Sequence, residues 1–231
     1  MAPWGSAEER SRMLFAEAIV ELQDARTREW HGTPGAAAQG TAGAAAQRRE
    51  GESTQAEEKW LAAVERQHRA NFDLWHIEDQ ARVPGASADE LAEVKRRVDR
   101  TNQLRNDRTE ELDRMLLARL EARSLPSAEA PLHSESPGLM IDRLSILALK
   151  IYHTREEAER EDAPAGHAMR NRERLAILEE QRADLAACMD TLWSETLAGT
   201  RRFKLYRQLK MYNDPSLNPA IYGKSPGGQG V

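Results

Sequence analysis

The stretch Gly138-Leu-Met-Ile-Asp-Arg-Leu-Ser-Ile-Leu-Ala-Leu-Lys-Ile-Tyr-His153 is the part of this chain that says most about its fold. From Leu139 to Tyr152 it is apolar nearly all the way round, which is typical of a helix buried on every side. Buried charges cost several kcal/mol unless they are paired. We therefore expect other segments to supply partners for the three charged residues of this helix, Asp142, Arg143 and Lys150.

Apolar residues at three- and four-residue steps predict four more helices, over residues 6–30, 54–83, 87–123 and 167–197. Pro84-Gly85 ends the second of these, and the capping-box pattern from Ser87 to Glu90 begins the third. Gly199 stands just past the end of the last, where glycine is favoured. The central helix opens at Pro137.

Two of these helices share a pattern of charges. Arg105-x-Asp107-x5-Asp113 matches Arg182-x-Asp184-x5-Asp190, and each arginine stands where a core leucine is expected. We predict an all-α fold with a four-helix core made of two antiparallel helical hairpins, residues 54–123 and 136–197, and we interpret the match as an internal repeat. Arg105 and Arg182 would face carboxylates such as Glu78, Asp79 and Asp142. An extra N-terminal helix and a short basic-aromatic C-terminal segment, residues 201–212, complete the fold.

The predicted domain organisation follows composition. Residues 1–31 hold the N-terminal helix, and residues 32–53 form a flexible Gly/Ala-rich loop, because nothing there is large enough to build a core. Residues 54–223 form the helical bundle, and residues 224–231 are a disordered tail.

The overall composition excludes several classes of protein. With 38 acidic and 33 basic residues the net charge is -5, which disfavours general nucleic-acid binding. Cys188, the one cysteine, excludes an internal disulfide and a multi-cysteine zinc site, and we expect it to be a small core residue. No signal peptide and no run of about twenty apolar residues is found, so we expect a cytoplasmic protein without a transmembrane segment. A homodimer through the first helix is compatible with all of this.

Charged and polar residues of four helices are expected to meet at the bundle centre. Arg105, Arg182 and Lys150 would hold an anion there, while His76, Glu78 or Asp79 would act as catalytic acid or base. The alternative is that the same charges form structural salt bridges that fix helix register. The predicted anion- or ligand-binding residues are Trp75, Arg82, Asn102, Arg105, Asp142, Arg143, Lys150, His153, Arg182 and Asp184, with Lys204, Arg207 and Lys210 from the C-terminal segment.

We expect no metal ion and no cofactor. Di-iron bundles use two Glu-x-x-His pairs, and here Glu65 with His68 is the one match. Mg²⁺ held by Glu78, Asp79 and Asp142, as in helical nucleotide pyrophosphohydrolases, stays open as an alternative. For His76 and His153, taken alone, a role as hydrogen-bonded core histidines is favoured over a catalytic role. In the C-terminal segment we expect aromatic residues to anchor it on the bundle: Phe203, Tyr206 and Tyr212.

Three segments, residues 71–82, 138–153 and 203–215, resemble a bacterial family of helical proteins of unknown function. That family is often encoded beside glycosyltransferases for lipopolysaccharide and other surface polysaccharides, and it lends no catalytic residues. The resemblance implies a role in surface-polysaccharide biosynthesis but no particular activity. Together with the charged residues at the bundle centre, it leads us to expect a protein that binds or transforms a phosphorylated sugar or nucleotide-sugar at that centre. The alternative is a non-catalytic adaptor that binds a glycosyltransferase or the inner membrane face through its C-terminal segment.

Overall fold

The computed structural model describes residues 15–32, 55–209 and 216–217, and these residues form an all-helical protein. Its helices are α2 (Phe15–Gly32), α3 (Gln55–Gln80), α4 (Ala88–Glu121), α5 (Pro137–Glu159) and α6 (His167–Leu197). The predicted all-α fold with five helices is confirmed. The first residues of the predicted N-terminal helix, most of the predicted loop 32–53 and the predicted tail 224–231 lie outside the described residues.

Local sequence signals set the helix ends. The Ser87 side chain accepts a hydrogen bond from the backbone N–H of Glu90, and the Glu90 carboxylate accepts one from the Ser87 backbone, so the predicted capping box is present. At the start of α5 the Ser136 side chain accepts from the Leu139 N–H. Gly199 follows α6 with φ of 74°, a left-handed conformation that glycine adopts without steric cost.

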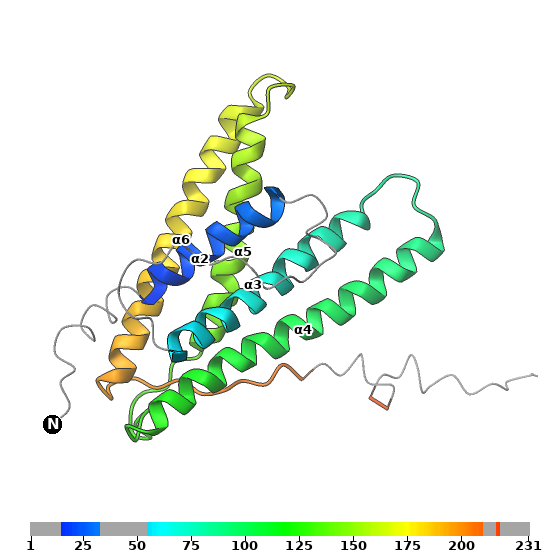
Figure 1. Cartoon of the computed structure of the whole chain (residues 1–231). Coiled ribbons are helices and arrows are strands. Elements are labelled where there is room, and N and C mark those ends of the chain that lie inside the picture. The colour runs from blue at the N-terminus through cyan, green and yellow to red at the C-terminus, as the bar shows by residue number, and fades with distance from the viewer. Residues whose placement is uncertain (1–14, 33–54, 210–215, 218–231) are drawn as a thin grey trace, which may run out of the picture.

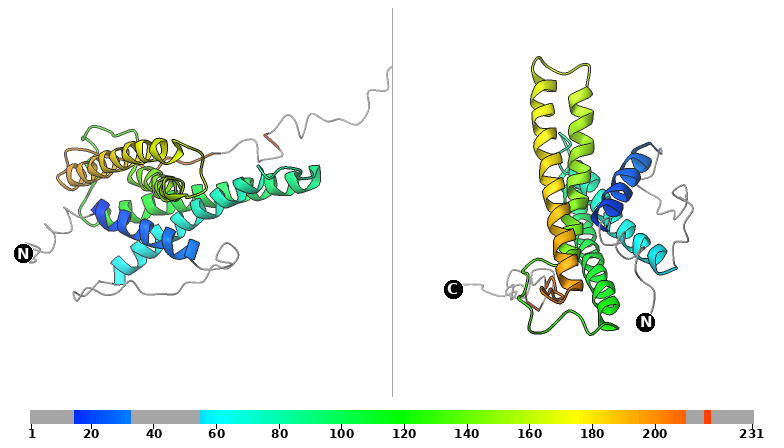
Figure 2. Two further views of the ribbon diagram at one scale, coloured as in Figure 1. Left: turned by 90° about the horizontal axis from the view of Figure 1, so that it is seen from above. Right: turned by 90° about the vertical axis from the view of Figure 1, so that its left-hand side faces the viewer.

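The helices are arranged as two long antiparallel hairpins, α3 with α4 and α5 with α6 (Figure 1). The hairpins pack against each other where α4 and α3 meet α5, and their tips, at residues 81–87 and 160–166, lie apart in Figure 1. Helix α2 crosses the assembly and packs on α5, α3 and α6, as the two further views in Figure 2 show. The predicted pair of hairpins is therefore confirmed, and α2 is an integral part of the core.

Apolar side chains from all five helices build the core. The larger cluster includes Ile19, Val64, Leu112, Met140, Ile141, Leu144, Leu185, Met189 and Leu192. A second cluster joins α4 and α6 to the C-terminal segment through Leu116, Leu120, Trp193 and Phe203. Phe203 is 1% exposed, so the expected docking of this segment on the bundle holds for its first aromatic residue. Tyr206 is half-buried, and Tyr212 lies outside the described residues.

Helix α5 is buried on most of its surface, but the prediction that all three of its charged residues are buried is wrong. Asp142 is 6% exposed, whereas Arg143 and Lys150 are exposed. The two residues are seven positions apart and therefore lie on the same face of α5. An exposed ammonium or guanidinium stays hydrated, so these two residues need no buried partner.

None of the described helices is both long enough and apolar enough to cross a membrane.

Candidate functional site

Asp142 lies at the centre of a buried polar network. Its Oδ1 accepts hydrogen bonds from Gln67 Nε2 at 2.6 Å, Asn71 Nδ2 at 2.9 Å and Arg105 Nε at 2.8 Å. Its Oδ2 pairs with a terminal nitrogen of Arg105, so the guanidinium holds the carboxylate through two nitrogens. The predicted pairing of Arg105 with a carboxylate is therefore confirmed for Asp142.

The network continues from Asp142 to helix α2. Asn71 Nδ2 also donates to Ser145 Oγ at 2.9 Å, and Ser145 Oγ lies 2.7 Å from His68 Nδ1. His68 Nε2 lies 2.9 Å from Thr27 Oγ1, whose hydroxyl donates to the Gln23 carbonyl at 2.8 Å. Burial lowers the pKa of His68 to about 3, which keeps the ring neutral.

The ion pair at the centre of this network leaves little capacity for a ligand. Both Asp142 oxygens accept hydrogen bonds from Arg105. The other terminal nitrogen of Arg105 donates to Asn102 Oδ1 at 3.4 Å. The ion pair with Asp142 raises the pKa of Arg105. We interpret this network as the element that fixes the register of α3, α4 and α5.

Arg182 pairs elsewhere than predicted. Its guanidinium contacts both oxygens of Asp24 in α2, at 2.7 and 2.9 Å, and not Glu78, Asp79 or Asp142. The sequence gives no strong signal for Asp24, because a lone carboxylate in an exposed-looking helix is common.

The matching charge patterns of α4 and α6 make matching contacts. Asp113 Oδ1 accepts the backbone N–H of Gly138 at the start of α5, at 2.7 Å. Asp190 Oδ1 accepts the backbone N–H of Ala16 at the start of α2, at 2.9 Å. In each pattern the arginine pairs with an aspartate further along the same neighbouring helix. The pattern therefore docks a helix antiparallel to α4 or α6, and the helix dipole favours a carboxylate at that terminus.

We expect the stability of the protein to respond to the ionisation of Asp113. Burial raises the pKa of Asp113 to about 6, against opposing hydrogen bonds from Ser136 and Gly138. The folded state therefore binds this proton more tightly than the unfolded state, and the contribution of Asp113 to stability falls as pH rises from about 4 to about 6. Urea unfolding should show that the free energy of unfolding of the parent, relative to Asp113→Asn, rises when the pH is lowered from 7 to 4.5. A constant difference would contradict the assignment.

Glu78 and Asp79 lie in the last turn of α3, and both pair with Arg82 in the turn that follows. Arg82 contacts Glu78 at 3.6 Å and Asp79 at 3.3 Å, and the side chains of the three are 47% to 67% exposed. Because Asp142 is already bound by Arg105, the three carboxylates that were an alternative Mg²⁺ site do not come together.

Three other predicted residues, Arg143, Lys150 and Asp184, line a groove of about 730 Å³ between α5 and α6. Met140, Ile146, Leu147 and Leu185 give it an apolar lining, and Gln181 and Cys188 stand beside them. Cys188 is exposed, so its expected place in the core is wrong. A groove of this volume is within the range of small-molecule sites.

The charges of the groove differ in their pairing. Arg143 Nη1 contacts both oxygens of Glu135, at 2.9 Å each, and His133 lies beside them on the same loop. Among the described residues neither Lys150 nor Asp184 forms an ion pair, so both are available to a ligand. This groove is the place where the predicted ligand-binding residues come closest to an open site.

His76 and His153 lie apart from the groove, in contact with His31 of α2. Their ring centroids are 5.0 and 4.8 Å from that of His31, and Trp75 stacks on His153 at 5.0 Å. Burial lowers the pKa of His31; the Thr27 carbonyl opposes this, and the neighbouring His153 and His76 add to it. The sequence does not mark His31 as a candidate site residue, because it lies beside the Gly-rich stretch. Its distance along the chain from His76 and His153 matches no metal-ligand motif.

The basic side chains of the C-terminal segment differ in their exposure. Lys204 and Arg207 are exposed, and Lys210 lies outside the described residues. Arg202 ties the segment to the loop before α5, because its backbone N–H donates to the Pro131 carbonyl at 3.0 Å and its Nε to the Ala130 carbonyl at 2.8 Å.

Comparison with known proteins gives a family and nothing narrower. Neither the curated proteins nor the solved structures contain a match. Residues 61–205, from α3 to the C-terminal segment, match the family described as "Protein of unknown function (DUF4254)". That match spans more than half of the chain, and the protein belongs to this family.

Proposed function

We propose that this protein binds a phosphorylated sugar or a nucleotide-sugar in the groove between α5 and α6, and that it serves surface-polysaccharide biosynthesis. The observation that carries the ligand class is Lys150, an exposed cation without an ion pair among the described residues, at the wall of a groove of about 730 Å³. The biological context rests on the family resemblance in the sequence. A glycosyltransferase partner stays a prediction from the same resemblance, and a cytoplasmic location stays a prediction from the sequence.

The groove offers the mixture of groups that such a ligand needs. Lys150 and Arg143 can bind phosphate oxygens. The Asp184 carboxylate and the Gln181 amide oxygen can accept hydrogen bonds from sugar hydroxyl groups. The apolar lining can pack against a sugar or base ring. At the buried network around Asp142, by contrast, the Asp142 carboxylate and the Arg105 guanidinium are already bonded to each other, so that arginine is not free to bind a phosphate.

Titration calorimetry with a panel of sugar phosphates and nucleotide-sugars tests the proposal. We expect one class of compound to bind, and Lys150→Ala and Arg143→Ala each to weaken that binding by about 10- to 100-fold, since a hydrogen bond to a charged group contributes about 1.5–3 kcal/mol. Lys95→Ala is the matched control, because Lys95 is an exposed helical lysine of α4 whose partner is Asp99.

Binding that is unchanged in both groove variants would contradict the site. If no compound binds, the proposal is wrong and the adaptor role becomes the better one. The observation in favour of that role is Leu209, which is 82% exposed and follows the exposed Lys204 and Arg207.

A further inference from the structure

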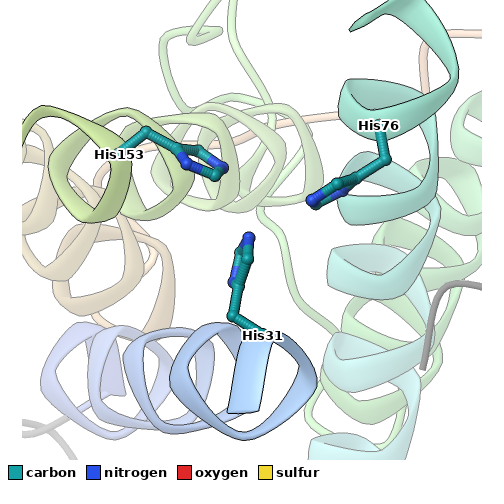
Figure 3. Close-up of side chains that lie close together, drawn as sticks. All are labelled: His31, His76 and His153. Atoms are coloured by element: carbon teal, nitrogen blue, oxygen red, sulfur yellow. The ribbon is translucent and has the colours of Figure 1, made fainter. Parts of the chain in front are cut away.

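Three histidines from three different helices meet near the C-terminal end of α2. His31 lies in the last turn of α2, His76 in the last turns of α3 and His153 in α5. One nitrogen of each ring lies within 4.8 Å of the other two. Figure 3 shows the three rings pointing from their helices into the same space.

The Nδ1 atom of each ring faces a group that can only accept a hydrogen bond. His31 Nδ1 lies 2.7 Å from the Thr27 carbonyl, and His76 Nδ1 lies 2.8 Å from the Phe72 carbonyl. His153 Nδ1 lies 2.9 Å from a carboxylate oxygen of Glu156. We therefore assign the proton to Nδ1 in all three rings, which leaves the lone pair of a neutral imidazole on Nε2.

Two of the three Nε2 atoms lack the hydrogen-bond partner that a buried structural histidine usually has. Those of His31 and His153 are buried and have no hydrogen-bond partner among the described residues. His68 is the contrasting case within the same protein, because it is fully buried and both of its nitrogens are hydrogen-bonded, to Ser145 and Thr27. Burying a polar atom without a partner is costly, and a cation between the rings that bonded to the lone pairs of both nitrogens would remove that cost.

We propose that His31, His76 and His153 bind one transition-metal ion of the Zn²⁺ class through their Nε2 atoms. Imidazole ligands suit Zn²⁺, Cu²⁺, Ni²⁺ and Fe²⁺, whereas Mg²⁺ and Ca²⁺ prefer oxygen. The site is separate from the groove between α5 and α6, and it stands or falls independently of the ligand proposed there.

The geometry requires a modest contraction. Bonds of about 2.0–2.1 Å to a tetrahedral zinc ion place the ligand nitrogens about 3.3 Å apart. The present separations are at most 4.8 Å, so each pair must approach by about 1.5 Å at most. All three histidines are half-buried and close to helix ends or the surface, where side chains can rotate into place.

The surroundings of the rings resemble the outer shell of a metal site. The bonds from Nδ1 to Thr27, Phe72 and Glu156 fix each ring and raise the basicity of Nε2, as carbonyl and carboxylate partners do in metalloproteins. Tyr152 stacks on His31 with ring centroids 4.2 Å apart, which further orients that ring.

Three protein ligands leave a tetrahedral ion with one open position, as in catalytic zinc sites rather than structural ones. The ion would also connect α2 to α3 and α5. His76 and His153 lie within the family match at residues 61–205, whereas His31 lies outside it. Helix α2 thus completes a site whose other two ligands come from the matched region.

Metal binding by the full-length protein, purified without a polyhistidine tag, tests the proposal. We expect calorimetry to show one Zn²⁺ per chain, and Co²⁺ to give the visible absorption of a four-coordinate ion. X-ray absorption of the zinc complex should show three imidazole ligands. His31→Ala, His76→Ala and His153→Ala should each weaken binding by at least about a hundredfold, and Glu156→Ala by about 10–100-fold.

The matched control is His167→Ala. His167 is a half-buried histidine at the start of α6, where it pairs with Glu157 of α5 and takes no part in the cluster of three rings. This variant should bind zinc as the parent does. Circular dichroism of each variant shows whether it is folded, and ¹H–¹⁵N spectra of the metal-free parent report the tautomers without any substitution. Failure of the parent to bind zinc, fewer than three imidazoles in its absorption spectrum, or binding that survives in the folded triad variants would overturn the proposal.

Discussion

Replacing Arg105 with leucine is expected to lower the free energy of unfolding by about 3 kcal/mol, the low end of the range for breaking a buried ion pair. The Asp142 carboxylate is 6% exposed, and in this variant it would lose both contacts with the guanidinium. The amides of Gln67 and Asn71 would still donate to it, which is why we expect the low end of the range. Urea denaturation followed by circular dichroism measures the change.

Arg82→Leu is the control for this substitution. Arg82 also pairs with two carboxylates, but its side chain is 67% exposed and theirs are 47% and 58% exposed. Exposed pairs of this kind contribute about 0–1 kcal/mol, so the variant should remain close to the parent. Equal effects of the two substitutions would show that burial of Asp142 is not what makes the Arg105 pair important.

A single methyl group at Gly138 is expected to cost about 2–3 kcal/mol, as overpacking in a core does. A Cβ at this position would lie 2.6 Å from the Thr109 backbone oxygen and 2.8 Å from the Asp113 carboxylate. The oxygen belongs to the backbone of α4 and cannot move aside without shifting the helix. The Gly138 N–H also donates to Asp113, so any shift weakens the attachment of α5 to α4.

Gly32→Ala provides the comparison for Gly138→Ala. Gly32 is the last residue of α2, and a Cβ there meets nothing within 4 Å. Alanine loses less conformational entropy than glycine on folding, so this variant should match the parent or gain up to about 1 kcal/mol. Thermal unfolding of the parent and the two variants compares their stabilities. A Gly138→Ala variant as stable as the parent would show that the close approach of α5 to α4 is not required.

The two proposed sites differ in how far the sequence could predict them. Arg143, Lys150 and Asp184 were expected to bind a ligand at the bundle centre, and the structure places them together in a groove on one side of α5. His76 and His153 were expected more often to be satisfied core histidines. They indicate a metal site only together with His31. That residue belongs to α2, which residues 33–54 separate from α3 in the sequence.

The sequence by itself determined the helices, their ends and their pairing into hairpins. Apolar periodicity, the capping box at Ser87 and the glycine after α6 act within a few residues, so they can be read without knowing the fold. The recurring Arg-x-Asp-x5-Asp pattern also pointed correctly to a repeated role, because each pattern docks the start of a neighbouring helix.

Only the tertiary structure decided which side chains meet. Arg182 pairs with Asp24 and Arg105 with Asp142, although the sequence offered several carboxylates to each. Contact between residues distant in the chain depends on how the helices cross and on their rotation about their own axes, and a rotation of one residue, about 100°, turns a core position into an exposed one. For the same reason the three histidines are far apart in the sequence, and the packing of α2 against α3 and α5 brings them together.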